Sequence, residues 1–186
     1  MKFSVKNLWK SYGKNQILKG YSYDFESGLY LLTGTNGIGK STLLKLIAKV
    51  IYPSNSNYHI DSKKVAYLCE KAELSSDKVE TYLKLICRLN HTTINIKELL
   101  EKWKIPNKNI SHLSKGNKQK VAILMMSLTS ADIYLFDEPT DSLDTIAKEH
   151  FCKLVESFLN DEKIVFICTH EKQVFKDFSY KEIMLQ

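Results

Sequence analysis

Two segments near the start of the chain alternate apolar and polar residues, as half-buried strands do. They read "KFSVKNL" and "GYSYDFE", and in the second of them Tyr21, Tyr23 and Phe25 fall on one face. Alternation of this kind gives a sheet one face for the core and one for solvent. We expect the two segments to form an antiparallel layer.

Four later segments are short, continuous apolar runs: "LYLLT", "KVAYL", "DIYLFD" and "KIVFIC". They are rich in Val, Ile, Tyr and Phe, and helical stretches lie between them. Runs of this kind are typical of strands that are buried on both faces in a parallel sheet. The pattern therefore predicts an α/β fold in which a largely parallel sheet accompanies the antiparallel layer.

Strand signals vanish between about residues 71 and 129. Helix-like segments replace them at Val79 to Leu89, Ile96 to Lys104 and Lys118 to Leu128. We predict that residues 71–129 form a helical subdomain within a single domain that spans residues 1–186. A chain of 186 residues with 44% hydrophobic content can bury one good core but not a second full one.

Composition indicates the cell compartment of the protein and the state of its cysteines. No apolar run approaches the ~18 to 20 residues that a membrane helix needs, so we expect a soluble, cytoplasmic chain. The four cysteines are far apart and form no C-x-x-C pair, which favours buried, reduced thiols over a zinc site or a disulfide framework. They are Cys69, Cys87, Cys152 and Cys168.

The net charge of +6 raises the question of a nucleic-acid partner or an acidic membrane surface. However, Arg88 is the only arginine, so the bidentate contacts that nucleic-acid readers favour are almost unavailable. The lysines are also spread along the chain without a dense block, which fits a solvated surface. We therefore predict that the protein has no nucleic-acid partner.

The strongest chemical signal is "GTNGIGKST", which satisfies G-x-x-x-x-G-K-[ST] between a predicted strand and a predicted helix. In such a P-loop, glycines let backbone N–H groups surround a phosphate, while Lys40 reaches the β and γ phosphates and Ser41 holds Mg²⁺. A glycine-rich turn that binds nothing is the alternative, but the strand–helix context argues against it. We predict that the nucleotide is bound by Thr35, Asn36, Gly37, Ile38, Gly39, Lys40, Ser41 and Thr42.

A second acidic element follows the predicted strand in "DIYLFDEPTDSLD". Asp137 would lie at the carboxyl end of that strand beside Ser41 and act as a metal ligand. Glu138 would then be placed to polarise a water for in-line attack on the γ-phosphorus. Alone, this segment could be an ordinary acidic turn. The P-loop makes a catalytic pair the better interpretation.

With these motifs, the sequence resembles the ATP-binding cassette (ABC) family over nearly its whole length. "LSKGNKQK" looks like that family's signature loop, usually L-S-G-G-Q, and matches it at Leu113, Ser114 and Gly116. "DSLD" resembles the D-loop and ends in Asp144, and "CTH" ends in His170 where the family has a switch histidine. Tyr12 stands where the family has an aromatic ring that stacks on adenine.

The resemblance implies a head-to-tail dimer in which two cassettes enclose two ATP molecules. Ser114, Gly116 and Asp144 would then bind the nucleotide held by the other subunit, and a serine hydroxyl with backbone N–H groups at a helix N-terminus suits an anion. The alternative for Ser114 is that it only caps the helix that follows. The resemblance also implies that Glu138, His170 and Lys40 are catalytic.

Two motifs depart from the family pattern. Lys115 and Asn117 replace the usual glycine and glutamine of the signature loop, and the lysine could either supplement the phosphate clamp or point to solvent. Glu70, in "YLCEK", stands at the place of the Q-loop glutamine and can still serve as a metal ligand. Glu70 and Lys115 resemble the residues of export-type cassettes at these places.

We therefore predict an ATPase subunit with ATP and Mg²⁺ as cofactors, peripheral at the inner face of the membrane. Its expected partners are a second cassette, identical or different, and a separate transmembrane permease that docks on the helical subdomain. Export is favoured. The alternatives are a soluble ABC ATPase that acts on nucleic acid or the ribosome, and an ATP-sensing regulator that does not hydrolyse.

Overall fold

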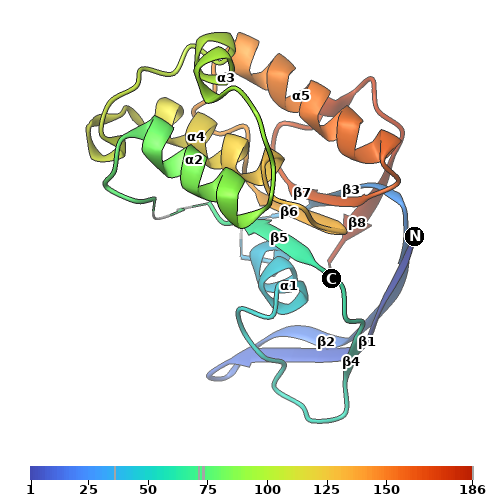
Figure 1. The fold of residues 1–186 in the computed structure, drawn as a ribbon. Helices are drawn as coiled ribbons and strands as arrows, with labels where there is room; N and C mark the ends of the chain where they lie inside the picture. Colours follow the sequence, from blue (N-terminus) through green and yellow to red (C-terminus); the bar gives the residue numbers. More distant parts are fainter. Residues whose placement is uncertain (36, 71, 73, 186) are drawn as a thin grey trace.

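The computed structural model describes residues 1–35, 37–70, 72 and 74–185, which form three layers (Figure 1). A five-stranded sheet lies in the middle, with helices on one side and a single helix followed by a smaller sheet on the other. The predicted α/β fold, with a parallel sheet, an antiparallel layer and helices, is confirmed.

The central sheet has the strand order β5-β6-β7-β3-β8, and all neighbouring strands are parallel. Its strands are β3 (Gly28–Thr33), β5 (Val65–Leu68), β6 (Ile133–Asp137), β7 (Ile164–Cys168) and β8 (Tyr180–Met184). Every residue of β6 and β7 is buried, as their continuous apolar runs predict. Because the strands are parallel, the segments after β3, β5, β6 and β7 all start at the same edge of the sheet.

The smaller sheet is antiparallel and has the order β2-β1-β4. It consists of β1 (Lys2–Tyr12), β2 (Asn15–Glu26) and β4 (His59–Ile60). Phe25 is fully buried, and Tyr21 and Tyr23 pack partly buried on the same side, which confirms the predicted face. Strands β4 and β8 have no counterpart in the sequence prediction, because one has two residues and the other mixes charged and apolar positions.

Helices cover both faces of the central sheet. The single helix between the two sheets is α1 (Lys40–Ile47). The opposite face carries α2 (Val79–Leu89), α3 (Ile96–Lys102), α4 (Lys115–Ser127) and α5 (Thr145–Asn160), with 3₁₀ turns at Ile110–His112 and Lys172–Phe175. Helices α2 to α4 fall in the region for which the sequence predicts a helical subdomain.

Helices α3 and α4 differ from the sequence prediction at their ends, and the end of α4 differs by a single residue. Helix α4 begins at Lys115, three residues before the predicted start, because Ser114 caps its first turn. Helix α3 ends at Lys102, and Lys104, with φ of 53°, has a left-handed conformation that does not continue a helix.

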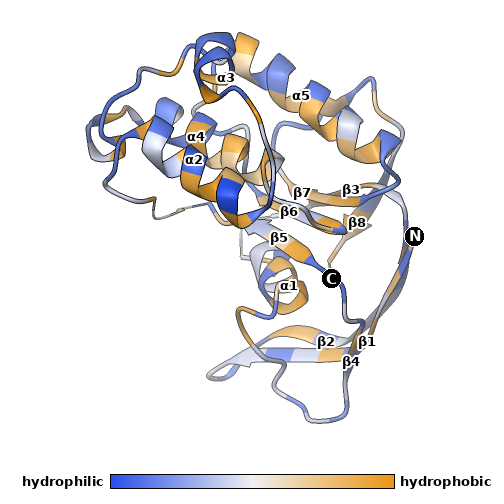
Figure 2. Ribbon diagram, viewed as in Figure 1, coloured by the Kyte–Doolittle hydropathy of each residue, from blue (hydrophilic) through white to orange (hydrophobic). Residues whose placement is uncertain are grey.

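The apolar residues form a core on each face of the central sheet. One core joins α1 to β1, β2 and the inner strands, and the other joins the sheet to α2, α4 and α5. Figure 2 shows the same division, with the central strands largely orange and α5 alternately orange and blue along its length. The two cores hold the carboxyl ends of the strands in fixed register, and the candidate site is built there.

Candidate functional site

The loop that joins β3 to α1 turns on glycines with left-handed backbones. Gly34, Gly37 and Gly39 have φ of 123°, 83° and 114°, values that residues with a side chain rarely adopt. At Gly39 an added Cβ would also come within 2.5 Å of a methyl group of Ile17. Helix α1 begins directly after Gly39. The first N–H groups of the helix have no helical acceptor and can face an anion.

Lys40 is the first residue of α1, and its ammonium group turns back toward the loop. Its Nζ donates hydrogen bonds to the carbonyl oxygens of Gly34 at 2.8 Å and Thr35 at 3.2 Å. Only 7% of the residue is exposed. A buried cation held by neutral carbonyls is well placed to bind a phosphate oxygen.

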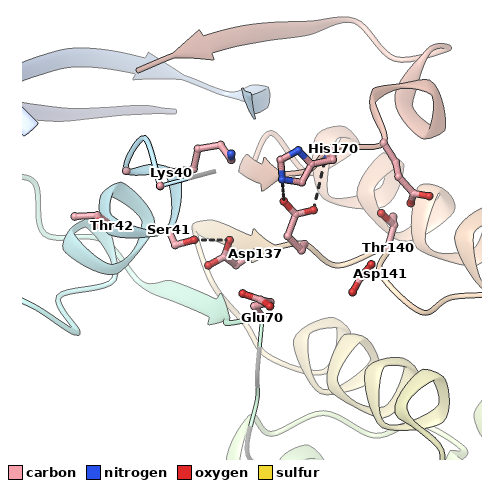
Figure 3. A pocket seen from close by; sticks show the side chains of 12 residues that line it. Lys40, Ser41, Thr42, Glu70, Asp137, Thr140, Asp141 and His170 are labelled. Atoms are coloured by element: carbon pink, nitrogen blue, oxygen red, sulfur yellow. Dashed lines mark hydrogen bonds and ion pairs between the residues drawn. The ribbon is translucent and has the colours of Figure 1, made fainter. Parts of the chain in front are cut away.

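Ser41 and Asp137 lie side by side although they are 96 positions apart in the sequence. The Ser41 hydroxyl donates a hydrogen bond of 3.0 Å to Oδ1 of Asp137, the last residue of β6 (Figure 3). The other oxygen of that carboxylate accepts a 3.4 Å contact from the Tyr67 hydroxyl, on neighbouring β5. The structure thus brings together two of the three predicted metal ligands.

Glu138 and His170 form the second pair of the site. The imidazole Nε2 of His170 lies 3.2 Å from Oε1 of Glu138, and the His170 backbone N–H donates to Oε2 at 3.3 Å. Glu138 has φ of 49°, a left-handed conformation that turns its side chain away from the strand direction. Burial raises the pKa of the Glu138 carboxyl, and the nearby His170 partly opposes that rise.

These pairs line one open pocket of about 540 Å³ (Figure 3). Of the predicted site residues, the pocket is lined by Gly37, Gly39, Lys40, Ser41, Thr42, Glu70, Asp137, Glu138 and His170. Thr140, Asp141 and Glu171 line it too, and the sequence prediction missed them. Their only signal in the sequence is that they follow Glu138 and His170 by one to three positions.

The donors present fit Mg²⁺ that arrives with a polyphosphate. Among the described residues no group of three or more His, Cys, Asp and Glu side chains could hold a metal ion by itself. Mg²⁺, however, prefers hard oxygen ligands, keeps several waters and usually takes one or two protein oxygens together with phosphate oxygens. The hydroxyl of Ser41 and the carboxylate of Asp137 supply such oxygens, and Glu70 lines the same pocket.

Several predicted nucleotide ligands lie outside the lining of the pocket. Thr35 and Ile38 belong to the loop, but their side chains are not part of that lining, and Asn36 lies outside the described residues. Tyr12, at the end of β1, is 50% exposed, and the ammonium of Lys10 lies 5.3 Å from the centre of its ring.

The predicted signature loop lies at the N-terminus of α4. The Ser114 hydroxyl accepts a hydrogen bond of 3.3 Å from the Asn117 N–H, so the capping contact expected as the alternative is present. Gly116 packs so closely on the segment before α5 that an added Cβ would stand 2.6 Å from the Ser142 carbonyl oxygen. A small residue is therefore required there by contacts within this chain.

Asp144 caps α5 and also binds α4. Its Oδ1 accepts from the Ala147 N–H at 2.8 Å, and its Oδ2 lies 2.7 Å from Nζ of Lys120. The Lys120 side chain is only 8% exposed, and the ion pair holds the pKa of the Asp144 carboxyl below its ordinary value. Both oxygens of Asp144 thus have partners inside the chain.

Arg88 and the cysteines take no part in this geometry. Arg88 is in the last turn of α2 and does not line the pocket. All four cysteines are free thiols, of which Cys87 and Cys168 are buried and the other two partly buried. None of the helices in the described part of the chain is long and apolar enough to cross a membrane.

The chain is similar in sequence and in structure to known proteins. Residues 18–141 match the family described as ABC transporter. An uncharacterized ABC transporter ATP-binding protein of Methanocaldococcus jannaschii is 31% identical over 180 residues, which cover 91% of this chain and 68% of the relative.

Two further relatives carry names that mention a cargo. A lantibiotic transport ATP-binding protein of Streptococcus pyogenes is 26% identical, with 89% of this chain and 79% of the relative covered. The ATP-binding protein of a zinc transport system of Streptococcus pneumoniae is 28% identical, with 98% and 88% covered. Among solved structures, an ABC transporter ATP-binding protein of Pyrococcus furiosus has a TM-score of 0.79 and 26% identity, covering 100% of this chain and 98% of its own.

Proposed function

The chain belongs to the ABC transporter family, and from this premise we propose that it is a single nucleotide-binding domain that hydrolyses ATP to power transport. One observation carries the proposal. The Ser41–Asp137 and Glu138–His170 pairs come from three separate segments and line the same pocket as Lys40. A phosphate-binding loop alone would not require the second pair.

The polyphosphate of ATP binds along the loop before α1. Lys40 exchanges its carbonyl acceptors, Gly34 and Thr35, for β and γ phosphate oxygens, which are stronger acceptors because they are charged. Ser41, Asp137 and Glu70 hold Mg²⁺, which when bound neutralises charge on the phosphate oxygens. Lys40 is the one lysine or arginine among the described residues of the pocket lining, so it also stabilises the charge of the transition state.

Glu138 accepts a proton from the attacking water. Its raised pKa makes the carboxylate a stronger base toward the attacking water. The backbone N–H of His170 fixes the orientation of the carboxylate. The imidazole of His170 lies on the other oxygen and is placed to contact the γ-phosphate side of the pocket. Tyr12 offers an exposed ring for stacking on adenine.

ABC ATP-binding subunits dimerise and work with membrane permeases, and we assign both kinds of partner to this chain. In the head-to-tail dimer Ser114, Gly116 and Asp144 approach the ATP of the other subunit. Support comes from Ser114 and Gly116, which lie at the N-terminus of α4 and outside the pocket of their own chain.

Export is the direction that we propose, at the cytoplasmic face of the membrane. Glu70 and Lys115 resemble export-type cassettes, and a lantibiotic transport protein is among the relatives. A zinc transport system is among them too, so the direction rests on those two residues. Flux of a cargo in vesicles that contain the permease, with ATP supplied on one side, measures the direction.

The substitution Glu138→Gln tests the hydrolytic function. It keeps the shape of the side chain and removes the base, so the rate of phosphate release should fall by about a hundredfold or more, while ATP still binds. An ATP-bound dimer should accumulate and be visible by size-exclusion chromatography. Hydrolysis at the parental rate would remove Glu138 from the mechanism, and a parent protein that binds ATP without hydrolysing it would favour an ATP-sensing regulator.

A further inference from the structure

The N-terminus of α4 and the segment of residues 139–144 are joined by four contacts. We call this set the α4 clasp. It consists of the 3.0 Å hydrogen bond from Gln119 to the Pro139 carbonyl, the 3.0 Å ion pair of Lys115 with Asp141, the packing of Gly116 on Ser142, and the 2.7 Å ion pair of Lys120 with Asp144.

The clasp fixes Lys115 next to a carboxylate that lines the ATP pocket. Gly116, one residue along the helix, contacts the backbone of Ser142, one residue along the segment from Asp141. The ion pair therefore lies beside a place where the two backbones already touch.

Electrostatics gives this pair a consequence for nucleotide binding. Five carboxylates of the described chain line the pocket, against one lysine: Glu70, Asp137, Glu138, Asp141 and Glu171. Glu171 is paired with Lys148 at 2.6 Å, and Asp141 is paired with Lys115. Each pairing reduces the repulsion that a carboxylate exerts on the incoming polyphosphate.

We propose that Lys115 is a positioning residue for the ATP pocket of its own subunit, which it serves by neutralising and holding Asp141. This inference rests on the proposed ATP-binding function. It assigns the departure at Lys115 a partner that neither sequence alternative included. The ammonium group binds a carboxylate of the same chain, in a pair whose two side chains are 76% and 65% exposed.

The affinity of the monomer for ATP tests the inference. It is measured by titration calorimetry with MgATP at low salt and at a protein concentration where the chain is monomeric. Lys115→Gln should weaken binding roughly 1.5- to 5-fold, the range expected for one exposed ion pair. Adding Asp141→Asn to that variant should restore the parental affinity, because the unpaired carboxylate is removed as well.

A matched control separates the pair from net charge. Lys118→Gln changes the same charge one turn further along α4, at a residue outside the clasp, and should leave the affinity within error of the parent. The loss in Lys115→Gln should also shrink in about 1 M salt, where the Debye length falls to about 3 Å.

Three results would overturn the inference. Equal effects of Lys115→Gln and Lys118→Gln would assign Lys115 to solvent. A loss that Asp141→Asn does not restore would give Lys115 a role apart from Asp141. Unchanged monomer affinity with weaker ATP-driven dimerisation would place Lys115 on the nucleotide of the partner. Failure of the parent protein to bind ATP would instead contradict the proposed function.

Discussion

Asp144 links two helices, α4 and α5, through one carboxylate. Its carboxylate caps α5 through the Ala147 N–H and pairs with Lys120, whose side chain is nearly buried. Asp144→Asn keeps a capping oxygen but leaves the lysine without a counter-charge. We expect a loss of about 1 to 2 kcal/mol in the free energy of unfolding at pH 7, below the usual cost for a charged hydrogen bond because Asp144 is 58% exposed and screened.

The pH dependence of that loss follows from the direction of the Asp144 shift. The pKa of the carboxyl is lowered in the folded state, so its contribution is full above the unfolded value of 3.8 and disappears as the pH falls through the folded value. The free energies of urea unfolding of the parent and Asp144→Asn should therefore differ at pH 7, and the difference should shrink as the pH falls below 3.8. A constant difference across this range would show that the ion pair is not its source.

At the scale of elements, the contact of Gly116 with Ser142 sets the distance between α4 and the segment before α5. Alanine normally stabilises a helix relative to glycine by roughly 0.5–1 kcal/mol. Here its Cβ would meet a backbone oxygen at 2.6 Å, which cannot rotate away. Gly116→Ala should therefore destabilise the protein by roughly 1–3 kcal/mol. Asn117→Ala in the same turn is the control, and a thermal midpoint of Gly116→Ala at or above the parent would contradict the prediction.

The N-terminus of α4 carries a second prediction, because Ser114 has a visible role as a cap and a proposed role in trans. Ser114→Ala should cost about 1 kcal/mol of stability through the lost cap. It should also weaken ATP-driven dimerisation by roughly ten- to a hundredfold through the lost phosphate contact. Ultracentrifugation with ATP in a Glu138→Gln background measures the second effect.

Two comparisons separate the roles of Ser114. Ser114→Asp keeps a good capping oxygen but adds negative charge, so it should retain stability and still lose dimerisation. A mixture of Lys40→Ala and Ser114→Ala chains should recover part of the hydrolysis, because one composite site of the heterodimer is then intact. Activity no greater than that of the two variants alone would mean that the loop serves only its own subunit.

At the scale of the whole molecule, the helical side should receive the permease. Leu85 and Leu89 on α2 are 49% and 67% exposed, although the opposite face of that helix is buried. Leu85→Glu with Leu89→Glu should reduce co-purification of a membrane protein while the ATPase activity of the isolated chain stays within twofold. Val50→Glu, at a residue 60% exposed after α1, is the control. Crosslinks from α2 to ribosomal RNA or only to non-membrane proteins would favour the soluble class of ABC ATPase.

The sequence by itself determined the features that depend on neighbouring residues. Continuous apolar runs predicted β3, β5, β6 and β7, because a strand buried on both faces must be apolar throughout. The spacing of Gly34, Gly39 and Lys40 predicted the loop before α1, because its left-handed turns need glycine. The same local patterns named most of the residues that line the pocket.

Only the tertiary structure decided which distant segments meet. The strand order brought Ser41 to Asp137 and Glu138 to His170, and it also placed Thr140, Asp141 and Glu171 in the pocket lining. Strands β4 and β8 formed where a neighbour supplied hydrogen bonds to segments with weak patterns of their own. Packing of α4 against residues 139–144 gave Lys115 its partner. These contacts depend on how the side chains of the two cores pack against the faces of the central sheet. Local periodicity in the sequence does not contain that information.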